Sequence, residues 1–157
     1  MVKKTICLVI PSLQAGGMER VISELGNCLV LRDDIEIVLI QYGNSEKFYA
    51  VSAKIVHEII PFKIDSYSKL GFTFKSLFFL RNAIKKHKPD AVLSFGETYN
   101  SFVLFALLGC RVKIFISDRS RPDKDWGTFH NFLRKYLYRS AAGIIAQTLI
   151  AKDFIFK

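Results

Sequence analysis

The stretch Thr5–Arg20, TICLVIPSLQAGGMER, decides the fold, because it contains a strand, a glycine turn and the start of a helix in that order. The apolar run ends at Pro11, which has no N–H to donate to a sheet, and apolar residues recur at helical spacing after the turn. Gly16 and Gly17 stand in the turn. Unpaired backbone N–H groups and the positive end of a helix dipole meet at such a turn, and both attract anions. The stretch therefore predicts a site for a phosphorylated ligand.

The glycine turn alone leaves two interpretations open. It has neither the GxGxxG fingerprint of dinucleotide-binding proteins nor the Lys-Ser/Thr ending of a phosphate-binding P-loop. Glycines at this place also serve a tight bend and close packing of helix on strand in parallel α/β proteins. An anion site and a purely structural turn are both consistent with the segment.

Length and charge limit the kinds of fold and the kinds of partner that this chain is expected to have. The chain has 157 residues, half of them apolar, which is enough for one domain with a hydrophobic core. Its formal net charge of +9 favours anionic partners such as phosphorylated ligands or acidic lipid headgroups. No nucleic-acid-binding motif accompanies this charge, so nucleic acid is not an expected partner.

Cysteine usage and apolar runs exclude other classes. Cys7, Cys28 and Cys110 are odd in number, widely spaced and set in apolar patterns, which predicts buried thiols in a reducing compartment. We expect no disulfide framework and no metal site. The apolar runs are far shorter than the roughly 20 residues that cross a bilayer, and we expect neither a signal peptide nor a membrane span.

Strand patterns alternate with helix patterns along the whole chain. Strands are predicted at 5–10, 35–42, 54–60, 91–95, 113–117 and 142–146, and helices at 18–29, 70–88, 101–108 and 126–137, with a further helix starting at 151. Such alternation implies right-handed crossovers and a mostly parallel sheet. The predicted fold class is α/β, a single Rossmann-like three-layer αβα domain over residues 1–157.

Ligands of open parallel sheets bind beyond the carboxyl ends of the strands. Four polar segments of this chain directly follow predicted strands: Gln14–Arg20, Tyr42–Asn44, Ser94–Asn100 and Ser117–Lys124. We expect the functional residues among them.

Several of these segments carry a family resemblance. The chain resembles the N-terminal half of a retaining, family 4 glycosyltransferase of the two-domain GT-B architecture. The motifs that carry the resemblance are GGMERV at 16–21, similar to the family's GGxERV opening, PDAVLSF at 89–95 followed by Asn100, ISDRS at 116–120 followed by Pro122, and AGIIAQT at 142–148.

The resemblance implies transfer of a sugar from a nucleotide-sugar donor to a glycan or lipid-linked acceptor, with no metal or other cofactor. It implies a setting in cell-surface polysaccharide assembly, in the cytoplasm or peripherally at the inner face of the cell membrane. In such enzymes a C-terminal domain holds most of the donor. That domain is not expected within 157 residues, so we expect this chain to be inactive alone.

Candidate site residues follow from chemistry and from the resemblance together. Gly16, Gly17 and Glu19 are predicted to contact the donor diphosphate or the acceptor, because negative charge develops on the leaving diphosphate. Glu19 has a structural alternative, since a carboxylate in the first turn of a helix is favoured by the dipole or by a reciprocal cap. No residue is assigned a catalytic role.

Acceptor-binding candidates follow the fourth and fifth predicted strands. They are Glu97 and Asn100 after the fourth strand, and Asp118 and Arg119 after the fifth. A helix cap or loop hydrogen bond is the alternative for the first pair. An ion pair of Asp118 with Arg121 or Arg119 is the alternative for the second.

The predicted helix at 70–88 interleaves phenylalanines with lysines and arginines. This composition suits an acidic membrane surface. A helix packed on the sheet with a solvated lysine face explains the same pattern. A noncatalytic nucleotide- or phosphate-binding module, or a membrane-surface module, therefore remains the alternative to a glycosyltransferase domain.

Overall fold

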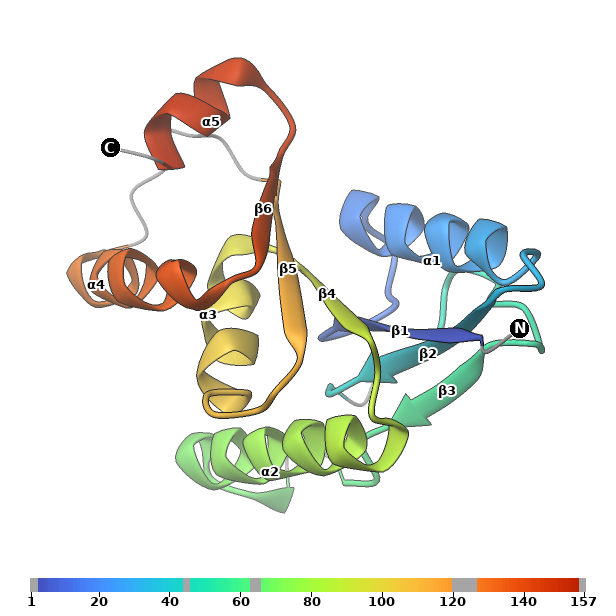
Figure 1. Ribbon diagram of the computed structural model, residues 1–157. Helices are drawn as coiled ribbons and strands as arrows, with labels where there is room; N and C mark the ends of the chain where they lie inside the picture. Colours follow the sequence, from blue (N-terminus) through green and yellow to red (C-terminus); the bar gives the residue numbers. More distant parts are fainter. Residues whose placement is uncertain (1–2, 44–45, 63–65, 120–126, 156–157) are drawn as a thin grey trace.

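The computed structural model describes residues 3–43, 46–62, 66–119 and 127–155. Its elements, in chain order, are β1 (Lys4–Ile10), α1 (Gly17–Leu29), β2 (Ile35–Gln41), β3 (Val56–Ile59), α2 (Lys69–His87), β4 (Ala91–Phe95), α3 (Glu97–Ala106), β5 (Lys113–Asp118), α4 (Thr128–Leu137), η2 (Tyr138–Ser140), β6 (Gly143–Ala146) and α5 (Leu149–Ile155). The strands form one sheet in the order β3-β2-β1-β4-β5-β6, and every pair is parallel (Figure 1). The predicted Rossmann-like parallel sheet is confirmed.

The strand order reverses between β1 and β4. The chain runs outward from β1 through β2 to β3, returns along α2, and continues outward on the other side through β4 and β5 to β6. β1 thus pairs with both β2 and β4, with Val9 opposite Ser94 in the latter pair. Such a reversal opens a crevice beyond the carboxyl ends of the two central strands.

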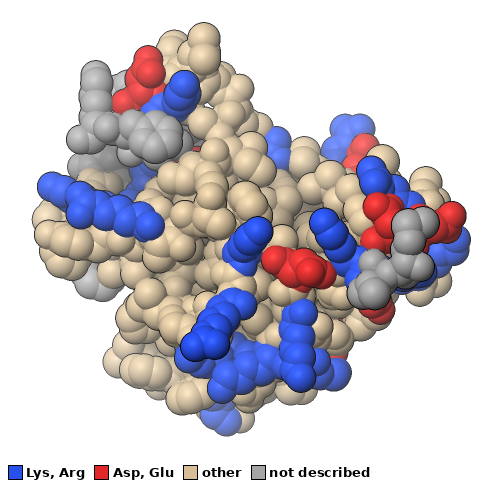
Figure 2. Space-filling model, viewed as in Figure 1, with Lys and Arg blue, Asp and Glu red and all other residues tan. Residues whose placement is uncertain are grey.

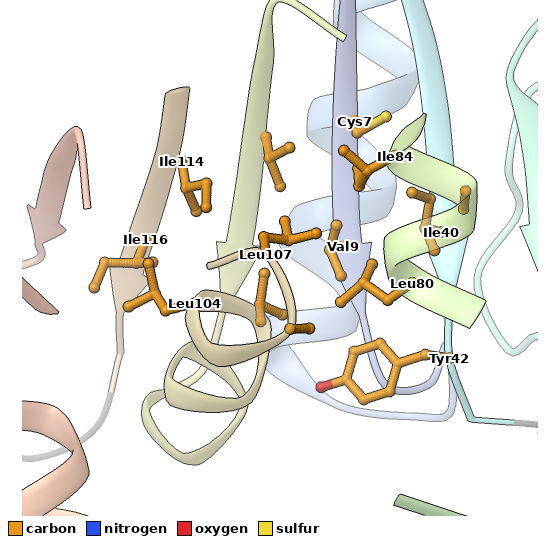
Figure 3. Packing of buried hydrophobic residues seen from close by; sticks show 14 of the residues in the cluster. Cys7, Val9, Ile40, Tyr42, Leu80, Ile84, Leu104, Leu107, Ile114 and Ile116 are labelled. Carbon is orange, nitrogen blue, oxygen red and sulfur yellow. The ribbon is translucent and has the colours of Figure 1, made fainter. Parts of the chain in front are cut away.

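Alternate residues of the central strands feed two separate cores. Leu8 and Ile10 face α1, where Ile22 completes their cluster. Cys7 and Val9 point to the opposite face, which α2 and α3 cover (Figure 3). The period-two alternation of a strand therefore decides which helix each side chain meets.

Helix α2 has clear signals at both ends. The Ser68 hydroxyl accepts a hydrogen bond from the Gly71 N–H at 3.2 Å, and Lys88 ends the helix in the left-handed conformation with φ of 45°. Pro89 follows directly and cannot continue the helix. The helix predicted over 70–88 is confirmed to within one residue.

Helix α3 corrects the prediction of a helix at 101–108. It begins at Glu97, directly after Gly96, and the Asn100 N–H closes its first turn onto the Gly96 carbonyl at 2.7 Å. The polar segment that resembled a loop is helical because Asn100 and Ser101 are buried against the sheet. Tertiary packing overrides the weak helix propensity of these residues.

Two further predictions were wrong in part. The strand predicted over 54–60 is shorter, Val56–Ile59, at the edge of the sheet. Cys28 is exposed rather than buried. Cys7 is buried, which raises the pKa of its thiol to about 12, and all three cysteines are free.

Trp126, expected to open the helix at 126–137, lies outside the described residues, and that helix begins at Thr128.

Candidate functional site

The loops that follow β1 and β4 meet at the strand-order reversal. They contain the start of α1 on one side and the start of α3 on the other (Figure 1). A Cβ built on Gly96 would lie 2.9 Å from the Met18 sulfur and 3.0 Å from the Tyr99 ring. The amino ends of α1 and α3 are therefore in direct contact at the point where the crevice is expected.

Both helices begin without a side-chain cap. Gly16 is the N-cap of α1 and Gly96 is the N-cap of α3, and neither provides a hydrogen-bonding side chain. The first N–H groups of any α-helix have no intrahelical acceptor. Two positive helix ends thus lie beside each other, which favours an anion between them.

The backbone at Gly16 and Gly17 does not require glycine. Gly16 has an extended φ of −172°, and the described glycines with positive φ are Gly96, Gly109 and Gly127. A Cβ on Gly17 would meet nothing within 4 Å. The interpretation of the pair as a tight turn or close packing therefore fails for Gly17, where the open space leaves room for a ligand to approach the backbone.

Glu19 folds back over the turn. A Cβ on Gly16 would collide with the Glu19 carboxylate, and the Ser12 hydroxyl lies 3.5 Å from Glu19 Oε1. The carboxylate thus lies at the positive end of α1, as the structural alternative for this residue requires. Arg20 pairs with Glu24 at 2.9 Å on the exposed side of α1.

A third loop, which follows β2, supports the glycine turn. The Phe48 N–H donates to the Leu13 carbonyl at 2.8 Å, and the Gly16 N–H donates to the Tyr49 hydroxyl at 3.3 Å. Tyr49 was not among the predicted site residues. No local pattern marks it, because it meets Gly16 across 33 residues of sequence.

Tyr42 lies at the carboxyl end of β2 but turns into the core. Figure 3 shows it beside Leu80 in the cluster of buried residues. Its ring stacks on Phe102 with centroids 5.0 Å apart, and burial raises the pKa of its hydroxyl well above the ordinary value. The hydroxyl therefore stays neutral. Asn44, from the same predicted segment, lies outside the described residues.

The two acceptor candidates after β4 have different surroundings. Glu97 opens α3, and its side chain lies outside the described part of the structure. Asn100 is fully buried, and its amide donates to the Ser117 carbonyl at 3.1 Å, which ties α3 to the end of β5. Its amide oxygen has no partner among the described residues. Contact of either residue with an acceptor remains a prediction.

Asp118 and Arg119 end β5 at the same edge of the sheet. Asp118 forms an ion pair with Arg134 of α4, at 2.8 Å, and its carboxylate is almost fully buried. Arg119 lies over the Phe95 ring at 5.6 Å, and the Gln147 amide oxygen, when turned toward it, accepts two of its N–H groups at 2.6 and 3.1 Å. Arg121 lies outside the described residues.

The arrangement suits a ligand that carries an anionic group and, next to it, hydroxyl groups. Gly17 and the start of α3 present backbone N–H groups, the Gly16 N–H is bonded to the Tyr49 hydroxyl, and Arg119 adds a guanidinium at the same edge. Among the residues that the structure describes, no group of three or more His, Cys, Asp or Glu side chains is arranged to hold a metal ion.

The model of the family described as Glycosyltransferase Family 4 matches residues 15–155. One curated relative is the GalNAc-alpha-(1->4)-GalNAc-alpha-(1->3)-diNAcBac-PP-undecaprenol alpha-1,4-N-acetyl-D-galactosaminyltransferase of Campylobacter jejuni. It is 31% identical over 135 residues, which are 85% of this chain and 37% of the relative.

Solved structures with the same fold include enzymes of different activities. Sucrose-phosphate synthase from Thermosynechococcus elongatus matches with a TM-score of 0.69 and 11% identity, over 90% of this chain and 42% of that chain. A putative UDP-N-acetylglucosamine 2-epimerase from Listeria monocytogenes matches with a TM-score of 0.67 and 13% identity, over 99% of this chain and 42% of that chain. At these identities the likeness shows the fold alone, and the chain spans less than half of each of these proteins.

Proposed function

Because the chain belongs to glycosyltransferase family 4, we propose that it is the acceptor-side domain of an enzyme that transfers a sugar from a nucleotide-sugar donor. The acceptor in this proposal is a glycan or a lipid-linked glycan. The Campylobacter jejuni relative supports that class, because its name specifies an undecaprenol-linked glycan.

The observation that carries the proposal is the pair of uncapped helix N-termini at the strand-order reversal. The contact between Gly96 and Met18 brings the amino ends of α1 and α3 together, and Gly17 leaves its backbone open to a ligand. Sugar transfer leaves negative charge on the departing diphosphate, and fixed N–H groups stabilise such charge without having to reorganise. In this proposal Gly16 and Gly17 contact the diphosphate or the acceptor.

In this proposal the other candidate residues stabilise the structure at the carboxyl ends of β4 and β5. Asn100 fixes α3 on the end of β5, and Arg134 compensates the buried charge of Asp118. The guanidinium of Arg119, held by Gln147, is oriented for a hydroxyl or a phosphate oxygen of the acceptor. Glu19 competes with an incoming anion for the amino end of α1, so in this proposal its carboxylate moves when a diphosphate binds.

Binding of the whole nucleotide-sugar donor, and therefore transfer, is proposed to need a second domain. The chain spans 37% of its curated relative and 42% of each of the two enzymes of known structure. A second domain, joined to this one or supplied separately, would then close over the crevice and complete the donor site. This chain by itself is proposed to be inactive.

A peripheral position on an acidic membrane is also part of the proposal. The exposed side of α2 carries Leu70, Phe74 and Phe78, between 59% and 74% exposed, beside several lysines. Aromatic side chains with cations suit the headgroup region of a bilayer. Among the described residues, no helix is long and apolar enough to span a membrane.

The test compares binding and transfer. Nucleoside diphosphates and polyprenyl diphosphate-linked glycans are titrated against the chain, and transfer from a panel of nucleotide sugars is measured with and without an added donor-binding domain. We expect diphosphate binding by the chain alone, weakened by Gly17→Ala, and transfer only in the presence of the second domain. Diphosphate binding that is unchanged by Gly17→Ala would contradict the proposed site, and turnover by the chain alone would contradict the need for a second domain.

A further inference from the structure

A cavity lies at the amino ends of the strands, on the opposite side of the sheet from the candidate site at their carboxyl ends. It has a volume of about 380 Å³ and lies between the C-terminal half of α2 and the segment Gly109–Val112. Pro89 leads into β4 and Val112 leads into β5, so the cavity is at the amino ends of these strands. The glycine turn lies beyond their carboxyl ends, and the two places are therefore separate.

Four cationic side chains line this cavity, which we call the basic pocket: Arg81, Lys85, Lys88 and Arg111. Arg81 and Lys85 are spaced i and i+4 in α2, which places them on one side of the helix, and Lys88 is the C-cap residue that follows it. Arg111 faces them from the loop before β5. Figure 2 shows Lys and Arg side chains gathered over the lower part of the molecule, where Figure 1 places α2.

The charge of the pocket is largely uncompensated. Within the described ranges of the chain, no ion pair engages Lys85, Lys88 or Arg111. Lys86, on another side of the same helical turn, differs in this respect, because it contacts Glu58 at 2.5 Å. The cations that face the pocket are thus available to a ligand, while their neighbour is not.

Arg81 is held in place rather than loose. Its Nη1 donates to the carbonyls of Ala106 and Leu108, each at 2.9 Å, at the C-terminal end of α3. These carbonyls carry no formal charge, so neither forms an ion pair with the guanidinium. One cation of the pocket is therefore fixed in position, which lowers the entropy that a ligand must remove on binding.

Apolar residues make up much of the remaining lining of the pocket. They are Ile84, Val112 and Pro89, together with the half-buried Cys110. A lining of cations and apolar side chains fits a ligand with an anionic head and a carbon-rich portion, and about 380 Å³ is within the usual range for small-ligand sites. Inorganic anions alone would leave the apolar lining without a partner.

We propose that the basic pocket binds a phosphate ester, with the phosphate among Lys85, Lys88 and Arg111 and the organic portion against Ile84 and Val112. The phosphate oxygens accept charge-assisted hydrogen bonds from the three cations, with Arg81 adding a fixed positive charge. A phospholipid headgroup and a soluble phosphate ester share this chemistry. The proposal does not depend on the transferase activity, because the pocket lies at the amino ends of the strands and the candidate site lies at their carboxyl ends.

The test measures binding at the pocket directly. Glycerol 1-phosphate is titrated by calorimetry, and sedimentation is measured with phosphatidylglycerol-containing vesicles and with phosphatidylcholine vesicles. The variant Lys85→Gln with Arg111→Gln is compared with Lys54→Gln with Lys152→Gln, which removes the same charge from exposed positions away from the pocket. Cys110 is a local reporter, and the exposed Cys28 on α1 is its internal control.

We expect binding of at least one of the two ligands, weakened about tenfold or more in the pocket variant and less than about twofold in the control variant. The bound ligand should slow alkylation of Cys110 and leave Cys28 unchanged. Binding to phosphatidylglycerol vesicles alone identifies a lipid headgroup, and binding of glycerol 1-phosphate identifies a soluble ester. Equal losses in the two variants, unprotected Cys110, or no binding of either ligand would overturn the proposal.

Discussion

Replacing Gly96 by alanine tests the contact that joins the amino ends of α1 and α3. Gly96 has φ of 92° and ψ of 134°, a conformation that side chains rarely adopt. Its new Cβ would lie 2.9 Å from the Met18 sulfur and 3.0 Å from Tyr99 Cδ2. The substitution therefore adds both backbone strain and a steric clash.

The size of the effect follows from these two contributions. Strain at such a backbone position is about 1–3 kcal/mol, and crowding of a packed contact adds about 1–3 kcal/mol. The Met18 end can move aside but the Tyr99 ring is less free, so we expect a total loss of about 3–4 kcal/mol in the free energy of unfolding. For a domain of this size, that lowers Tm by roughly 6–16 °C.

Gly109→Ala is the matched control. Gly109 also has a positive φ, of 76°, but a Cβ there would meet nothing within 4 Å. Only the backbone contribution remains, and we expect a loss of about 1–2 kcal/mol. The difference between the two alanine variants contains the clash at the crevice together with the difference in backbone strain, and the coupling to Met18 separates these two contributions.

The assay is urea unfolding followed by far-ultraviolet circular dichroism for both variants and for a double-mutant cycle of Gly96→Ala with Met18→Ala. Removing the Met18 side chain should relieve part of the clash, giving a coupling energy of at least about 0.5 kcal/mol. Equal losses for Gly96→Ala and Gly109→Ala, together with zero coupling to Met18, would refute the packing of α1 against α3 described here.

Three further predictions address single residues. Gly17→Ala should stabilise the chain by about 0.5–1 kcal/mol in thermal unfolding, because alanine favours a helix and no atom obstructs its Cβ. The same variant should bind diphosphate more weakly in calorimetry. A loss of stability would contradict the open space at this position. Arg134→Ala should lower the free energy of urea unfolding by about 2–4 kcal/mol, since it removes the cation that lies 2.8 Å from the buried Asp118 carboxylate, and an effect below about 0.5 kcal/mol would show that the pair contributes little. Burial, with a smaller contribution from Lys47, lowers the pKa of His57 below its ordinary value. As the pH falls, the unfolded chain therefore binds a proton at this position before the folded chain does. The free energy of unfolding should then decrease below a pH of about 6.5, by at most about 1.4 kcal/mol per pH unit. His57→Asn should flatten that slope in unfolding measured from pH 7.5 to 5.5, and an unchanged slope would assign it to other groups.

Local patterns predicted the sheet because each strand is a short apolar run with its own stop signal. Pro11 ends the run that forms β1, and Pro89 follows the helix that leads into β4. Those signals are local in sequence and need no knowledge of neighbouring elements. The parallel order then followed from the alternation of strands and helices.

Local patterns failed where burial decided the structure. The start of α3 was placed four residues late, since Glu97 to Asn100 has the composition of a loop. Asn100 becomes helical because its side chain is buried against β5, where the Ser117 carbonyl accepts its N–H. Cys28 lies in an apolar pattern but faces solvent, because α1 covers the sheet with only one side.

The sequence by itself determined the fold class, the glycine turn and the strand ends where the candidate site residues lie, because hydrophobic period, turn residues and strand ends are properties of neighbouring positions. Only the tertiary structure decided which groups meet: Arg134 with Asp118, Tyr49 with Gly16, and Arg111 with the cations of α2. These contacts join residues 16 to 33 positions apart, and 23 to 30 positions apart across the basic pocket, and they form when loops and helices that are distant in the sequence pack around one sheet. Pairing at such separations depends on the three-dimensional packing of whole elements, which no local pattern contains.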